Sequence, residues 1–239
     1  MCIARIGDAI VRSAVGAAMA GLTILAATVP TVAADCKTSP RQGIDWSACD
    51  RRNLMLSGAN LAGANLDSTD FTLTDLRNAN LTSASLEKAT LVRVSLDGAV
   101  ADKANFTNVE AYRANLRRLS ARGALFLGSE FSRADFSNAD LAGSSFEKAE
   151  LGRASFEGAD LTDTTFTFAN LARANLQKVR AGGSLDFTGT HMFLTRIEGL
   201  DLSGARGLVQ EQIDNACGDT KTTLPVGLSS PGAWPCASE

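Results

Sequence analysis

Proline is missing from the middle of this 239-residue chain. All five prolines lie near the two ends, and none occurs between Arg41 and Leu224. Proline removes a backbone hydrogen-bond donor, so its absence fits a long stretch whose backbone groups pair with neighbouring segments. Glycine and proline are together too sparse for a collagen-like or low-complexity protein.

Histidine and tyrosine are almost absent, with one residue of each, whereas phenylalanine occurs eleven times. The single histidine, His191, belongs to no recognisable catalytic motif, and phosphate-loop, dinucleotide and HExxH patterns are lacking. We therefore predict that the protein is not an enzyme and has no catalytic residues, no metal site and no cofactor.

Net charge is also low, at −3 for the whole chain. This value excludes a strongly basic nucleic-acid binder and a polyacidic tail. Nucleic acid is therefore not an expected partner.

The N-terminus has the pattern of a secretory signal. Arg5 and Arg12 precede a charge-free run, residues 13–34, which ends in the small residues Val32-Ala33-Ala34. We predict a signal peptide over residues 1–34 and export to the periplasm or the extracellular space. The alternative is an uncleaved membrane anchor, because the run is long enough to span a bilayer.

The middle of the chain repeats every five residues. Of the 25 positions reached in steps of five from Leu56 to Leu176, 22 are Leu or Phe and three are Ala. Two residues before each of these centre positions, 16 of 25 residues are Ala and none is charged. Asn or Asp often stands immediately before the centre, as in Ala59-Asn60-Leu61. A period of five matches neither a helix nor a lone strand.

This pattern resembles the pentapeptide repeat family, whose repeat is A-(D/N)-L-x-x. The resemblance implies an all-β fold, a right-handed quadrilateral β-helix with twenty residues per coil and the centre residues inside. Nine of the eleven phenylalanines occupy centres, and Phe106, Phe126, Phe146 and Phe166 should stack as an internal ladder. After Ala181 the centres shift by one residue to Phe187, which predicts an insertion at Gly182-Gly183-Ser184.

A solenoid has open ends that need covers. We expect an N-terminal cap over residues 35–53, the β-helix over 54–206 and a C-terminal cap over 207–239. Leu208, Ile213 and Ala216 predict a short capping helix that stops at Gly218. Together with nearby apolar residues, this cap is a candidate homodimer surface: Met192, Phe193, Leu194 and Trp234.

Four cysteines remain after the signal, an even number that favours disulfides in an exported chain. Four cysteines allow three pairings. In the solenoid that the resemblance implies, two of these pairings would join opposite ends of the rod. Only Cys36–Cys49 and Cys217–Cys236 then remain for a monomer.

The twenty-residue period also predicts rows on the outer surface. Five arginines, which we call the Arg ladder, lie twenty residues apart: Arg93, Arg113, Arg133, Arg153 and Arg173. Three residues earlier stand Glu110, Glu130 and Glu150, the Glu row. The two rows could neutralise each other, or the Arg ladder could bind an acidic partner surface or a polyanion.

Two functions remain open. The first is a non-catalytic exported scaffold for an unknown protein partner in the cell envelope, touching the membrane only if the signal is uncleaved. The second is a DNA-mimicking topoisomerase-binding protein, because some cytoplasmic members of the resembled family bind DNA gyrase. The 19 acidic and 18 basic residues between Asp50 and Arg206, together with the export signal, count against the second.

Overall fold

The computed structural model describes residues 34, 36–234 and 236. Every described residue belongs to the second of the two units into which the chain divides, Ala33–Glu239. The predicted signal peptide lies outside the described residues except for Ala34. No helix in the described part is long and apolar enough to cross a membrane.

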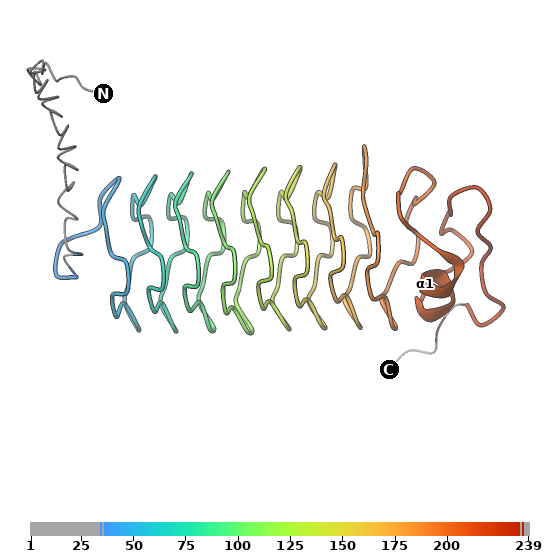
Figure 1. Cartoon of the computed structure of the whole chain (residues 1–239), viewed down its shortest axis with the longest axis horizontal. Coiled ribbons are helices and arrows are strands. Elements are labelled where there is room, and N and C mark those ends of the chain that lie inside the picture. Colours follow the sequence, from blue (N-terminus) through green and yellow to red (C-terminus); the bar gives the residue numbers. More distant parts are fainter. Residues whose placement is uncertain (1–33, 35, 235, 237–239) are drawn as a thin grey trace, which may run out of the picture. The chain divides into compact units, whose positions relative to one another are not determined.

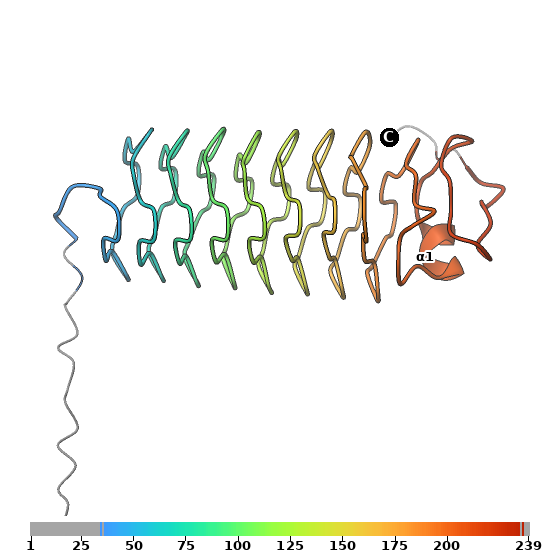
Figure 2. The ribbon, with the colours of Figure 1, turned by 90° about the horizontal axis from the view of Figure 1, so that it is seen from above.

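The second unit is a stack of similar coils that ends near helix α1, Gln210–Asn215 (Figures 1 and 2). Its strands are single parallel bridges, which from Asp45↔Asn65 to Asp160↔Arg180 join each residue to the one twenty positions later. Four bridge positions recur in every twenty residues, so neighbouring coils pair along the stack as adjacent parallel strands do. The repeat solenoid is therefore confirmed.

The solenoid register extends further at both ends than the expected span of residues 54–206. At the N-terminal end, bridges begin at Asp45, because Trp46 already occupies a fully buried centre position. At the C-terminal end, bridges continue to Arg196↔Cys217 and Asp201↔Thr223. Each predicted cap segment thus contributes part of a coil.

The core consists of the predicted centre residues and the small residues two positions earlier. All nine centre phenylalanines are fully buried. Phe126 stacks on Phe106 at 4.9 Å between ring centroids and on Phe146 at 4.4 Å, and Phe146 stacks on Phe166 at 5.2 Å. The internal ladder is confirmed, and its offset-stacked rings add to the stabilisation from burial.

Threonine is tolerated in the small-residue positions because its hydroxyl finds a backbone acceptor. Thr164 Oγ1 donates to the Leu141 carbonyl at 2.9 Å, and Thr195 Oγ1 donates to that of Leu171 at 2.8 Å. Both side chains are fully buried. A buried hydroxyl that is hydrogen-bonded avoids most of the desolvation penalty.

The register slip is also confirmed. Asp160 pairs with Arg180 at the usual separation of twenty, whereas Thr165 pairs with Asp186 at twenty-one. Gly183 lies between these pairs with φ of +68°, a conformation that glycine adopts without steric cost. One residue has been inserted, so the other bridges that cross the insertion, such as Asn175↔Arg196, also span twenty-one residues.

Helix α1 is shorter than an average helix and is fixed through Gln212. The buried Gln212 side chain donates from Nε2 to the carbonyls of Phe187 and Thr190, both at 2.8 Å. Its Oε1 accepts from the Val209 N–H at the start of the helix, also at 2.8 Å. Ile213 is fully buried beside it. One side chain thus satisfies backbone groups of both the last coils and the helix.

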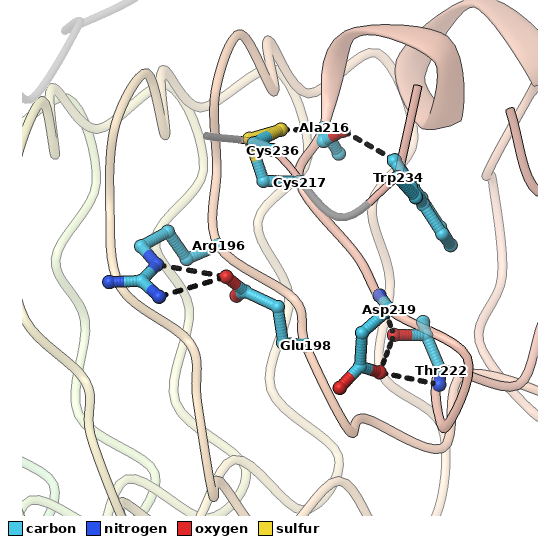
Figure 3. The surroundings of a disulfide bond; sticks show 8 residues. All are labelled: Arg196, Glu198, Ala216, Cys217, Asp219, Thr222, Trp234 and Cys236. Carbon is cyan, nitrogen blue, oxygen red and sulfur yellow. Dashed lines mark hydrogen bonds and ion pairs between the residues drawn. A yellow bond between two sulfur atoms is a disulfide. The ribbon is translucent and has the colours of Figure 1, made fainter. Parts of the chain in front are cut away.

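Both cysteine pairs form local disulfides, in agreement with the predicted pairing. The Cα atoms of Cys36 and Cys49 are 5.5 Å apart, and those of Cys217 and Cys236 are 5.3 Å apart. Figure 3 shows the second bridge beside Trp234, whose indole N–H donates to the Ala216 carbonyl at 2.7 Å.

Candidate partner-binding surface

The residues of the Arg ladder lie in turns and have a left-handed backbone conformation, which L-residues rarely adopt. Its five residues have φ between +54° and +60°, in the left-handed region. The backbone N–H of each donates to a carbonyl of the next coil, as Arg133 N does to Gly152 O at 2.9 Å. The ladder is therefore stacked in register, and four of its members are exposed while Arg173 is half-buried.

Elsewhere on the solenoid, several arginines form ion pairs with aspartates. Arg118 holds Asp97 with two hydrogen bonds, of 2.9 and 2.7 Å, between neighbouring coils. Arg117 lies 3.1 Å from Asp135, and Arg180 lies 3.0 Å from Asp160. The guanidinium of Arg118 lowers the pKa of Asp97, mainly by hydrogen bonding. These arginines neutralise acids of their own chain.

The ladder behaves differently. Within the described residues, no ion pair joins Arg93, Arg113, Arg133 or Arg153 to any acid. The mutual neutralisation of the ladder and the Glu row is therefore not observed.

The Glu row is equally distinct from its surroundings. Elsewhere, Asn or Asp before the centre accepts a hydrogen bond from the turn N–H two residues later, as Asp70 Oδ1 does from Thr72 N at 2.9 Å. No such bond is recorded for Glu110, Glu130 or Glu150 in the described part of the chain, and all three are exposed. Glu150 instead accepts from Asn170 Nδ2 at 2.8 Å. The longer side chain gives up a turn-stabilising bond and projects its charge outward.

A third row lies between these two in the sequence. We call it the middle row, and it comprises Val92, Tyr112, Ser132, Gly152 and Ala172. Tyr112, the only tyrosine, is 39% exposed, and the Arg113 guanidinium lies 5.2 Å from the centre of its ring. The middle row is thus mostly small, with one aromatic side chain reaching the surface.

His191 and the potential metal ligands do not form a catalytic or metal site in the described residues. His191 is exposed, and its ring centroid lies 6.5 Å from that of Phe193. No group of three or more His, Cys, Asp or Glu in the described residues could hold a metal ion.

The predicted dimer surface at the C-terminal cap is reduced, because Met192 is buried. Trp234 is half-buried and bonded within its own chain. Phe193 remains 44% exposed, and Leu194 is half-buried. The two large side chains that were expected to enlarge this apolar patch are therefore largely used by the fold.

A comparison with protein families decides where the chain belongs. The family described as "Pentapeptide repeats" matches it in eight copies, whose segments together span residues 56–185, more than half of the chain. The chain belongs to the pentapeptide repeat family. No curated protein matches it.

Solved pentapeptide repeat structures are similar in fold. A trypsin-treated variant of QnrB1, a plasmid-mediated fluoroquinolone resistance protein, is 19% identical, with a TM-score of 0.50 over 76% of this chain and 87% of that one. HetL, involved in heterocyst differentiation regulation in the cyanobacterium Nostoc sp. strain PCC 7120, is 22% identical. It matches over 80% of this chain and 94% of its own, with a TM-score of 0.37.

Proposed function

We propose that this pentapeptide repeat protein is a non-catalytic, exported scaffold that binds a protein partner in the cell envelope through its Arg ladder. The observation that carries the proposal is that Arg113, Arg133 and Arg153 form no ion pair within the described residues, whereas Arg117, Arg118 and Arg180 pair with aspartates. An exposed guanidinium is well suited to bidentate binding of carboxylates.

The binding proposal is tested by replacing Arg113, Arg133 and Arg153 with Gln. Capture of partners from cell-envelope extract should be lost, while the free energy of unfolding stays within about 0.5 kcal/mol of the native value, as for ordinary surface changes. The matched control is Arg117→Gln with Arg118→Gln, which removes paired arginines. Undiminished capture by the triple variant would refute the role of the ladder.

Export is supported by the signal-like N-terminus and by two disulfides, which persist in oxidising compartments. Fusing the first 40 residues to alkaline phosphatase tests it, because that reporter is active only outside the cytoplasm. A fusion that stays inactive and inside the cell would contradict export.

The second candidate is a DNA-mimicking topoisomerase-binding protein, favoured by the fold that the chain shares with a fluoroquinolone resistance protein. DNA mimicry requires a strongly acidic rod, and this one has 19 acidic and 18 basic residues over residues 50–206. Inhibition of gyrase supercoiling by the purified protein would reverse our preference.

We also infer that each coil is four-sided and right-handed and that α1 caps the C-terminal end. Four bridge positions per coil and the Gln212 hydrogen bonds support this architecture. A Gln212→Leu variant should be destabilised by about 1–3 kcal/mol, because the Phe187 and Thr190 carbonyls each lose a donor. An unchanged thermal midpoint would contradict the capping role.

A further inference from the structure

We propose that the surface bound by the Arg ladder is the Glu row of a second copy of this chain, packed side by side, parallel and in register. This inference rests on the proposed function of the ladder and names its partner. It starts from the observation that the Arg ladder and the Glu row form no ion pairs with each other in the described residues.

The Glu row argues against a simple polyanion as the occupant. Each glutamate stands three residues before a ladder arginine in the same coil, so an extended anion lying on the ladder would also meet Glu110, Glu130 and Glu150. A suitable partner must bring an acidic and a basic row together, with the spacing of stacked coils. A second copy carries both rows with that spacing, about 4.8 Å per coil.

Charge fixes the relative direction of the two copies. When two identical faces meet with their stacks parallel, the order of the rows is reversed in the partner, so that the Arg ladder faces the Glu row and the middle row faces itself. Antiparallel stacks would instead place each row opposite its own copy, with like charges opposed. Only the parallel arrangement is attractive.

Symmetry fixes the register. A two-fold axis parallel to the stack and running along the middle row brings every coil opposite its own copy, which closes the dimer. Arg113, Arg133 and Arg153 then meet Glu110, Glu130 and Glu150 of the second copy, and the reverse pairs form as well. A shift by one coil would keep ion pairs but would leave an open, non-closing contact.

The middle row permits this approach. Ser132 and Gly152 are small, so the charged side chains on both sides can reach across. Gly152 is not required by the backbone, because its φ is outside the left-handed region and a Cβ there would meet nothing closer than 3.8 Å. Tyr112 would meet its own copy, and aromatic residues are favoured at the centres of interfaces.

The first test measures association of the purified protein by sedimentation equilibrium, from micromolar to sub-millimolar concentration. We expect dimers at low ionic strength that dissociate at high salt, since exposed ion pairs are screened. Arg113→Glu, Arg133→Glu and Arg153→Glu combined should abolish the dimer, as should Glu110→Arg, Glu130→Arg and Glu150→Arg combined. Mixing the two variants should restore association as a heterodimer, which also demonstrates that both are folded.

The second test locates the axis by mild oxidation of single cysteine variants. Ser132→Cys and Gly152→Cys should each cross-link to themselves, because both positions lie on the two-fold axis. In antiparallel stacks related about Ser132, only the first variant would cross-link. Ser57→Cys, an exposed serine in the equivalent position of another row, is the control that should remain monomeric.

Three outcomes would overturn the proposal: a protein that is monomeric at every salt concentration, a dimer that survives charge reversal, or a failure of both axis variants to cross-link. The proposed function is judged separately. If the protein is monomeric but still captures an envelope partner through the ladder, the function stands and self-association is wrong.

Discussion

The Arg ladder and a second row of turn residues adopt the same backbone conformation with different side chains. The second row, the Gly/Asn row, follows one repeat later in every coil and has φ between +53° and +72°. It comprises Gly58, Asn78, Gly98, Arg118, Asn138, Gly158, Lys178 and Gly199. Glycine and asparagine adopt this conformation routinely, whereas other L-residues incur a cost of roughly 1–2 kcal/mol in it.

The difference separates what the fold needs from what it merely tolerates. The Gly/Asn row follows backbone preference, and its one arginine, Arg118, is paired with Asp97 at 2.7 Å. The Arg ladder goes against backbone preference in five successive coils, and four of its arginines have no ion pair within the described residues. This contrast between the two rows is the basis of the proposal that the ladder binds a partner.

The largest expected effect on stability comes from replacing a glycine of the Gly/Asn row by a residue that is strained at positive φ. Gly98→Val should lower the free energy of unfolding by about 1–3 kcal/mol, because a β-branched residue is strained at φ of +69°. Its Cβ would also lie 2.7 Å from Asn78 Oδ1. Chemical denaturation measures the change. Asn78→Ala in the same background removes the clash, so a full recovery would show that backbone strain contributes nothing.

The next largest effect is expected from acid, which should lower stability by protonating the aspartates that accept hydrogen bonds from neighbouring side chains. Hydrogen bonds from Arg118 and Arg77 lower the pKa of Asp97 and Asp75, and Thr223 contributes most to lowering that of Asp201 to about 2. A lowered folded-state pKa adds stability that is complete above the unfolded value of about 3.9 and is lost as pH falls through the folded value. Thermal midpoints should therefore be flat from pH 7 to pH 5 and fall towards pH 2. Asp97→Asn should reduce the slope, and a midpoint that rises on acidification would contradict the assignment.

Breaking one pair of the Gly/Asn row should cost less. Arg118→Gln removes both hydrogen bonds to Asp97 and should lower the free energy of unfolding only slightly, because an exposed pair is well solvated. The decrease should shrink in high salt, which screens the charges. Arg113→Gln is the matched control from the ladder, and an equal loss there would abolish the distinction between the rows.

The smallest effect is expected in the ladder itself. Arg133→Gly relieves the left-handed strain but adds chain entropy to the unfolded state, and the two terms of about 1 kcal/mol nearly cancel. The free energy of unfolding should therefore stay within about 0.5 kcal/mol of the native value. A loss above about 1 kcal/mol would contradict this expectation, because it would mean that the Arg133 side chain stabilises the fold.

The sequence predicts the core better than the surface. Centre residues such as Phe126 recur every five positions, and the burial of each contributes roughly 1.5–3 kcal/mol, so the pattern that places them inside tolerates few exceptions. The slip at Gly183 was visible for the same reason. The start of the solenoid at Asp45 was missed because the expected centre at position 51 is arginine, whose guanidinium lies 3.7 Å from the centre of the Trp46 ring.

Surface pairing could not be predicted in this way. The sequence puts Glu130 and Arg133 three residues apart, which suggests a pair, and puts Asp97 and Arg118 twenty-one residues apart, which does not. The structure pairs only the second, because stacking brings a turn residue beside the preceding coil. Exposed pairs differ by less than about 1 kcal/mol, so local turn geometry selects among them.

By itself, therefore, the sequence determined the repeat, the buried rows, the stacked phenylalanines and the twenty-residue period that aligns the outer rows. These follow from hydrophobic burial, which a strict period repeats many times along the chain. Only the tertiary structure decided which charges are neutralised and which remain available to a partner. That choice depends on distances across coils, which are set by the left-handed turns and the stacking of the backbone.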